Sequence, residues 1–113
     1  MSSFTWPTTI SAKKFHVDNL RYRMITTYVG PGTEYVPEAY VNRHALERSF
    51  CDPTSANRAI VRDERFIFRA SPGDVLLMKG FGASRGGGAV HRSPPIEGTE
   101  ERRVVLVVST VGP

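Results

Sequence analysis

Three side chains in this sequence are of the types that together bind a divalent metal: His16, Asp18 and the distant His91. In an extended strand alternate side chains share a face, so His16 and Asp18 point the same way, roughly 7 Å apart along the backbone. Two neutral imidazoles and one carboxylate form the facial triad that holds Fe(II) and leaves about half of its coordination positions open. These three residues are therefore candidate ligands of a mononuclear metal site and candidate catalytic residues.

The motif His-x-Asp alone is not specific, because a chain of this size can carry one by chance. The alternative is that His16 and Asp18 form an ordinary surface pair at the end of a strand. Two other reactive side chains have structural interpretations. His44 lies in a polar stretch of helical composition and is expected to be solvated, and Cys51 has no Cys or His at zinc-finger spacing, so it is expected to be a small buried apolar residue.

The segment 80–88 contains five glycines in nine residues and follows an apolar stretch. A glycine-rich loop after a strand can bind phosphate, but no helical pattern follows and the Gly-Lys-Ser/Thr ending is missing. We interpret it as a flexible loop at the mouth of the site, because glycine lets the backbone pass close to a ligand or move as a lid.

Length and composition predict one globular domain covering residues 1–113. Apolar residues make up 40% and charged residues 23%, with ten Gly and eight Pro, which suits a loop-rich β protein rather than disorder. The net charge is +4, but the basic residues are scattered singly. This pattern permits a nucleic-acid partner without favouring one.

The cysteine content and the absence of long apolar runs indicate the compartment. A single cysteine excludes an internal disulfide and fits a reducing environment. No apolar run approaches about 18 residues, and residues 1–14 lack the pattern of a secretory signal. We expect a soluble, cytoplasmic protein with no membrane partner.

The elements that must position the three ligands are mostly short strands. Alternating or β-branched runs bounded by Gly and Pro predict eight of them, at 15–18, 21–29, 33–36, 59–62, 65–69, 75–79, 89–92 and 102–109. One short helical excursion is expected within 38–58, over 42–48 with Asn42 as its cap, and residues 1–14 are a polar or edge-strand segment. The pattern predicts a mainly all-β fold of the jelly-roll type.

Five motifs occur in order along the chain: His16-x-Asp18, Arg-Met-Ile-Thr-Thr-Tyr-Val-Gly-Pro-Gly-Thr-Glu, Pro72-Gly73-Asp74-Val75, His91-Arg-Ser-Pro-Pro, and Arg103 before an apolar strand. This order resembles the double-stranded β-helix of the 2-oxoglutarate and Fe(II)-dependent dioxygenases. Phe-His-x-Asp, Thr-Tyr-Val-Gly-Pro-Gly-Thr-Glu and Val-His-Arg-Ser-Pro-Pro are more closely similar to an uncharacterised family, a domain of unknown function (DUF1826). The resemblance spans about residues 14 to 110.

The resemblance implies Fe(II) as the metal, 2-oxoglutarate as cosubstrate, and His16, Asp18 and His91 as the iron ligands. In many dioxygenases a basic residue ten to twelve positions after the distal His binds the far carboxylate of 2-oxoglutarate, and Arg103 stands at this distance. Its neighbour Arg102 is the alternative. Only one of the two can enter the barrel, because neighbours in a strand face opposite ways. Arg103 is favoured, since it directly precedes the β-branched run.

A hydroxyl or phenol often assists cosubstrate binding in these enzymes, and Tyr28, Thr26 and Ser93 are the candidates. The predicted function is hydroxylation of an unidentified small-molecule or peptide substrate. Two alternatives stay open: a cupin-like metal-binding protein without oxygenase activity, and a truncated, catalytically silent interaction domain. Because few residues precede the first ligand strand, part of the sheet is expected to be exposed, and a second copy in a homodimer would cover it.

Overall fold

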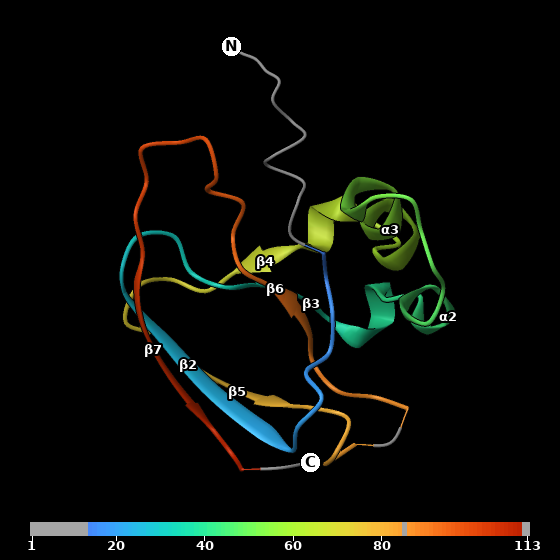
Figure 1. The fold of residues 1–113 in the computed structure, drawn as a ribbon, viewed down its shortest axis with the longest axis horizontal. Coiled ribbons are helices and arrows are strands. Elements are labelled where there is room, and N and C mark those ends of the chain that lie inside the picture. Colours follow the sequence, from blue (N-terminus) through green and yellow to red (C-terminus); the bar gives the residue numbers. More distant parts are fainter. Residues whose placement is uncertain (1–13, 85, 112–113) are drawn as a thin grey trace.

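The computed structural model describes residues 14–84 and 86–111 and is mainly β, as expected (Figure 1). The strands are β2 (Tyr22–Val29), β3 (Glu34–Val36), β4 (Phe68–Arg69), β5 (Val75–Lys79), β6 (Val90–Arg92) and β7 (Val104–Ser109). The helices are α2 (Arg43–Leu46) and α3 (Pro53–Ile60), with 3₁₀ turns η1 (Glu38–Tyr40) and η2 (Glu64–Phe66). The edge strand expected within residues 1–14 lies, apart from Lys14, outside the described residues.

The strands form two three-stranded antiparallel sheets, with the orders β5-β2-β7 and β4-β3-β6. The chain passes repeatedly between them: β2, β5 and β7 belong to the first sheet, and β3, β4 and β6 to the second. The strand predicted over 15–18 is not formed as a strand: only His16 pairs, through an isolated bridge to His91 of β6. This alternation between two sheets is the winding expected of a double-stranded β-helix, and it brings residues near both ends of the chain together.

Two predicted strands are wholly or partly helical. In the strand predicted over 59–62, residues 59 and 60 instead form the end of α3. Asp52 caps the start of this helix, because its side chain accepts a hydrogen bond from the Ser55 amide at 2.7 Å. Of the predicted strand only Val61 makes a bridge, to Val41. Over 65–69, η2 takes the first residues and leaves a two-residue strand. The region therefore holds two α-helices instead of one.

The helix predicted over 42–48 is present as α2, and Asn42 caps it as expected by accepting from the Ala45 amide. His44 is exposed on this helix, also as expected. The prediction for Cys51 was wrong, because its side chain is exposed rather than buried. It lies just before the cap of α3, at the surface between the two helices.

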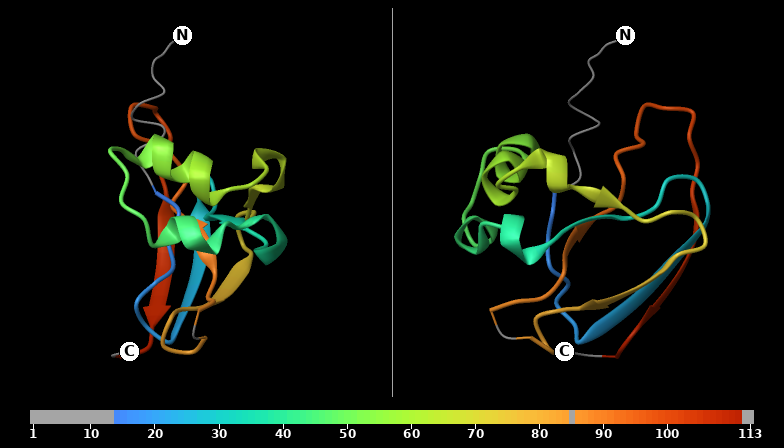
Figure 2. Two further views of the ribbon diagram at one scale, coloured as in Figure 1. Left: turned by 90° about the vertical axis from the view of Figure 1, so that its right-hand side faces the viewer. Right: turned by 180° about the vertical axis from the view of Figure 1, so that it is seen from behind.

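Both helices pack on the second sheet, on the side away from the first sheet (Figures 1 and 2). The buried apolar cluster lies in this layer and consists of Phe15, Val17, Val36, Val41, Ala45, Ala56, Ile60, Val61 and Val90. Val90 faces the helices, and the next residue of β6, His91, must therefore face the first sheet. The second sheet thus has one face for the core and one for chemistry.

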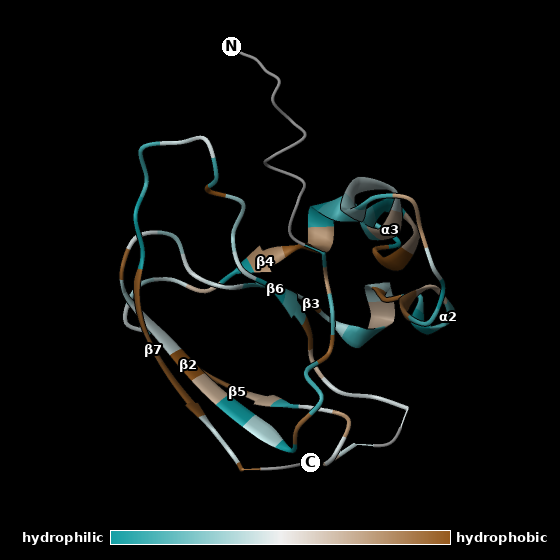
Figure 3. Cartoon of the chain, in the orientation of Figure 1, coloured by the Kyte–Doolittle hydropathy of each residue, from teal (hydrophilic) through white to brown (hydrophobic). Residues whose placement is uncertain are grey.

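Strand β7 of the first sheet is apolar along its length, as its brown colour in Figure 3 shows. The exposed large side chains of this sheet are Tyr28, Val29, Val75, Leu77, Val104, Val105, Leu106, Val107 and Val108. Within the described chain β7 pairs only with β2, so its other edge is free. The exposed sheet that motivated the homodimer prediction is therefore present, and dimerisation itself stays a prediction.

Among residues 14–84 and 86–111, no helix has the length and apolar character needed to cross a membrane.

Candidate metal centre

The three predicted ligands meet between the two sheets. Nε2 of His16 lies 3.5 Å from Oδ1 of Asp18, and Nε2 of His91 lies 3.4 Å from Oδ2 of the same carboxylate. One ligand atom from each residue can be chosen so that all three lie within 4.8 Å of one another. Within the described part of the chain, these residues are the one group of three or more His, Cys, Asp or Glu close enough to share a metal ion.

Backbone pairing places the two imidazoles side by side. His16 and His91 are direct partners in an antiparallel bridge and exchange two backbone hydrogen bonds of 3.0 Å. Directly opposed residues share a face, and the ring centroids lie 4.6 Å apart. Asp18 follows two positions after His16 and so returns to the same side of the chain.

Each imidazole is oriented by a backbone carbonyl near it in the sequence. Nδ1 of His16 lies 2.9 Å from the oxygen of Lys14, and Nδ1 of His91 lies 2.9 Å from the oxygen of Ala89. A carbonyl oxygen can only accept, so each Nδ1 donates its proton and each neutral ring keeps a lone pair on Nε2. Both lone pairs therefore lie on the side of Asp18.

The two oxygens of the Asp18 carboxylate differ, because Nη1 of Arg23 lies 3.3 Å from Oδ1. Oδ2 of Asp18 is buried and receives no hydrogen bond in the described structure. Burial lowers the pKa of His91, which is 5% exposed and lies 3.4 Å from Asp18, and this favours the neutral imidazole. Nε2 of each histidine and a carboxylate oxygen without a hydrogen-bond partner converge here, and a divalent metal would satisfy all three.

The triad opens into a small cavity of about 170 Å³. It is lined by His16, Arg23, Ile25, Thr33, Met78, His91, Ser93, Arg103, Val105 and Val107. These residues come from both sheets, so the cavity lies between them. Of the predicted assisting residues, Ser93 is brought to the cavity.

Arg103 reaches this cavity and Arg102 does not. Nη2 of Arg103 donates to the hydroxyls of Thr27 and Thr33, both at 3.3 Å, and its Nε is buried without a partner in the described structure. Burial is the main reason that the pKa of Arg103 is lowered, and the charge of Arg69 adds to the effect. Arg102 is exposed. The strand predicted over 102–109 begins only at Val104, so both arginines precede β7, and of the two only Arg103 lines the cavity.

Tyr28 and Thr26 do not line the cavity. Along β2 the inward positions are Arg23, Ile25 and Thr27, so Thr26 lies on the other face, and the Tyr28 side chain is 60% exposed at an irregularity of the pairing with β7. The hydroxyls that contact Arg103 instead belong to Thr27 and Thr33, which sequence reasoning missed. The period of two along β2 is the signal that could have pointed to Thr27.

The turn from Gly30 to Glu34 makes close contacts with distant parts of the chain. A Cβ at Gly30 would overlap the backbone carbonyl of Arg102, so this close approach requires glycine. Thr33 contacts Arg103. Glu34 is buried and accepts from Nε of Arg92 at 2.8 Å and from Nη2 of Arg69 at 2.6 Å, which ties β3 to both neighbouring strands. The turn therefore fixes both Arg103 and the strand that carries His91.

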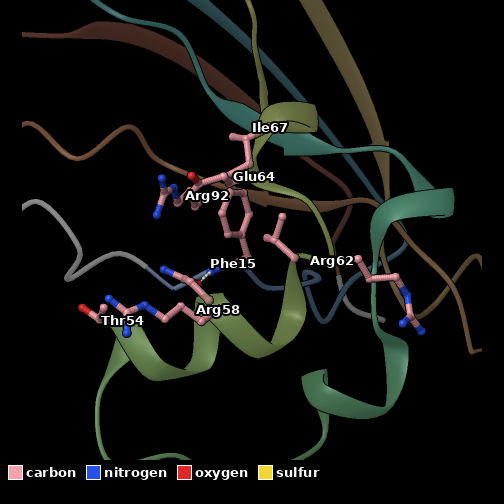
Figure 4. Close-up of a pocket in the computed structure, with 9 residues that line it drawn as sticks. Phe15, Thr54, Arg58, Arg62, Glu64, Ile67 and Arg92 are labelled. Carbon is pink, nitrogen blue, oxygen red and sulfur yellow. Dashed lines mark hydrogen bonds between the residues drawn. The ribbon is translucent and has the colours of Figure 1, made fainter.

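A groove with a volume of about 430 Å³ lies on the opposite side of the second sheet. Phe15 and Arg92 line it (Figure 4), and they are the sequence neighbours of His16 and His91. Arg92 stacks over the Phe15 ring at 4.4 Å. No triad residue lines this groove. The metal ligands and the groove therefore use opposite faces of the same strands.

The start of the glycine loop is bound to the segment that carries Asp18. The amide of Phe81 donates to the Asp18 carbonyl at 3.0 Å, and the amide of Gly80 donates to the Arg21 carbonyl at 2.8 Å. None of the described residues of this loop, 80–84 and 86–88, is among those lining the cavity. The first residues of the loop therefore support the segment that carries Asp18. A lid role for the loop stays a prediction.

We expect Gly80→Ala to destabilise the protein by about 1–3 kcal/mol and to weaken Mn(II) binding. A Cβ at this position would overlap the carbonyl oxygens of Leu20 and Asp18, so the ligand strand must move. Gly87→Ala is the matched control, because its nearest contact is the flexible Ser84 hydroxyl. Urea unfolding and Mn(II) titration measure both effects. Equal midpoints and equal Mn(II) affinities in the two variants would contradict this role of Gly80.

Comparison with known proteins gives a family but no activity. No curated protein and no solved structure matches the chain. The model of one family, described as "Protein of unknown function (DUF1826)", matches residues 8–109, which is most of the sequence. The chain therefore belongs to the DUF1826 family of proteins of unknown function.

Proposed function

We propose that the protein is an Fe(II) and 2-oxoglutarate-dependent dioxygenase that hydroxylates an unidentified substrate. The observation that carries the proposal is the shared cavity: His16 and His91, two members of the triad, line the same small space as Arg103. A metal-ligand set and a receptor for a carboxylate are thus available to one small molecule.

The triad supplies ligands from one side only. His16, Asp18 and His91 come from two neighbouring segments of the second sheet, which leaves the side of the cavity for other ligands. Fe(II), when bound together with 2-oxoglutarate, would supply the activation of O₂ that hydroxylation of a C–H bond requires. The side chain of His16 is 48% exposed, so the site is also open toward solvent on this side.

Arg103 would bind the far carboxylate of the cosubstrate. Its planar guanidinium suits bidentate capture of a carboxylate, and Thr27 and Thr33 hold one of its nitrogens in place. A volume of about 170 Å³ is below the roughly 300–1,000 Å³ of pockets for drug-sized ligands. The cavity therefore fits a small dicarboxylate, and a larger substrate would approach from the open side.

The wall between the metal site and Arg103 is apolar. Ile25, Met78, Val105 and Val107 contribute their side chains to it. Such a wall excludes water, and a lower local dielectric strengthens the attraction between a guanidinium and a carboxylate. The proposed cosubstrate would thus be charged at both ends and surrounded by apolar groups along its length.

Anaerobic titration tests the proposal. Addition of Fe(II) and 2-oxoglutarate together is expected to give a weak visible charge-transfer band that neither gives alone, and the exposed-site variant Arg102→Gln should retain it. Metal binding without this band would support a cupin-like protein without oxygenase activity. Failure to bind metal would support a catalytically silent interaction domain.

A further inference from the structure

Arg23 is the second guanidinium in the cavity, and the proposed function leaves it without a role. Its Nε donates to the Ser109 hydroxyl at 3.1 Å, and its Nη1 lies 3.3 Å from Oδ1 of Asp18. The latter distance is long for a hydrogen bond between charged groups, which is typically 2.7–2.9 Å. Nη2 has no hydrogen-bond partner among the described residues, and the side chain is 33% exposed. Arg23 therefore has donors available to a ligand.

The two arginines serve opposite ends of the cavity. Thr27, which contacts Arg103, stands four residues after Arg23 on β2, or about 13 Å along the strand. Asp18 lies at the Arg23 end. A cosubstrate that reaches from the triad to Arg103 therefore does not cover Arg23, which lies on the other side of Asp18.

The charges of the occupied site favour one more anion. None of the ten cavity-lining residues is Asp or Glu. A divalent metal and two arginines bring four positive charges, and Asp18 with a dicarboxylate brings three negative ones. Arg103 would be neutralised by the cosubstrate, so the remaining positive charge lies at Arg23.

We propose that Arg23 binds an anionic group of the substrate, a carboxylate or a phosphate. The inference rests on the function proposed above, and it restricts the substrate to small anions or to larger molecules that present such a group to the open side of the site. A guanidinium with two free donor positions suits both chemistries. The competing role for Arg23 is to orient Asp18 without contacting substrate.

The test uses protein loaded with Mn(II) and saturated with 2-oxoglutarate, titrated calorimetrically with acetate, inorganic phosphate and acetamide. Wild-type protein is expected to bind at least one of the two anions ten or more times more tightly than acetamide, and the preferred anion indicates carboxylate or phosphate. Arg23→Gln should lose at least tenfold in affinity for that anion. Arg102→Gln, at an exposed position outside the cavity, should change it less than twofold.

Anion affinities no better than that of acetamide, or equal in wild type and Arg23→Gln, would overturn the proposal. Should Arg23→Gln lose Mn(II), Arg23→Lys decides, because it keeps the charge but not the planar fork. About tenfold weaker acetate binding by Arg23→Lys is expected, and unchanged binding of both anions would overturn the proposal. Failure of wild-type protein to bind 2-oxoglutarate would contradict the dioxygenase function. Normal 2-oxoglutarate binding, with anion binding unchanged by the Arg23 substitutions, would contradict only the role of Arg23.

Discussion

Arg103→Gln is expected to raise the dissociation constant for 2-oxoglutarate more than a hundredfold while Mn(II) binding stays close to that of wild type. Loss of one partner from a buried pair of charges typically costs about 3–5 kcal/mol, because the other charge is left without compensation. Arg103 lines the cavity, is held by two threonine hydroxyls and has no contact with the triad carboxylate in the described structure. Its replacement should therefore affect the cosubstrate and not the metal.

The neighbouring arginine is the internal control for this experiment. Arg102 is exposed, and exposed charges usually contribute less than about 1 kcal/mol, so Arg102→Gln should change 2-oxoglutarate binding by no more than a fewfold. Calorimetric titration of both variants, with Mn(II) as an inert substitute for iron, makes the comparison. Equal small effects would mean that neither arginine holds the cosubstrate and would remove the main support for an oxygenase beyond the triad.

His16→Ala is expected to lower Mn(II) affinity at least tenfold while leaving the fold intact. His16 supplies one of three ligand atoms, yet its side chain is 48% exposed, so truncation creates no buried cavity. His44→Ala is the matched control, since His44 is an exposed histidine on α2. Mn(II) titration measures the affinity, and far-ultraviolet circular dichroism checks the fold. Metal binding by His16→Ala at the level of the control would argue against the triad.

The alternation of side chains along an extended segment accounts for part of the candidate site. Alternation places His16 and Asp18 on one side, and a bridge to His91 completes the group. Arg102 and Arg103 lie just before β7, and only Arg103 lines the cavity. The shared side of His16 and Asp18 depends on one segment only, so the sequence contains that information, whereas the bridge to His91 joins two distant segments.

The errors arose where a short apolar run fits two structures. Residues 59–62 contain three apolar side chains in succession, which suits a strand or the end of a buried helix. The deciding interaction is the Asp52 cap at the other end of α3, seven residues before the run. Thr33 and Gly30 were missed for a different reason: their partners, Arg103 and Arg102, lie about seventy residues later and become neighbours only when the sheets form.

The bridge between His16 and His91 also determines when the metal site can form during synthesis of the chain. His91 stands 73 positions after Asp18 (91 − 18), and at about 5–20 residues per second a ribosome needs about 4 to 15 seconds to synthesise that interval. During this time the nascent chain carries a histidine and a carboxylate without the third ligand. The complete triad exists only once β6 has joined the segment that contains His16, so occupancy by metal would report that the two distant parts of the chain have found each other.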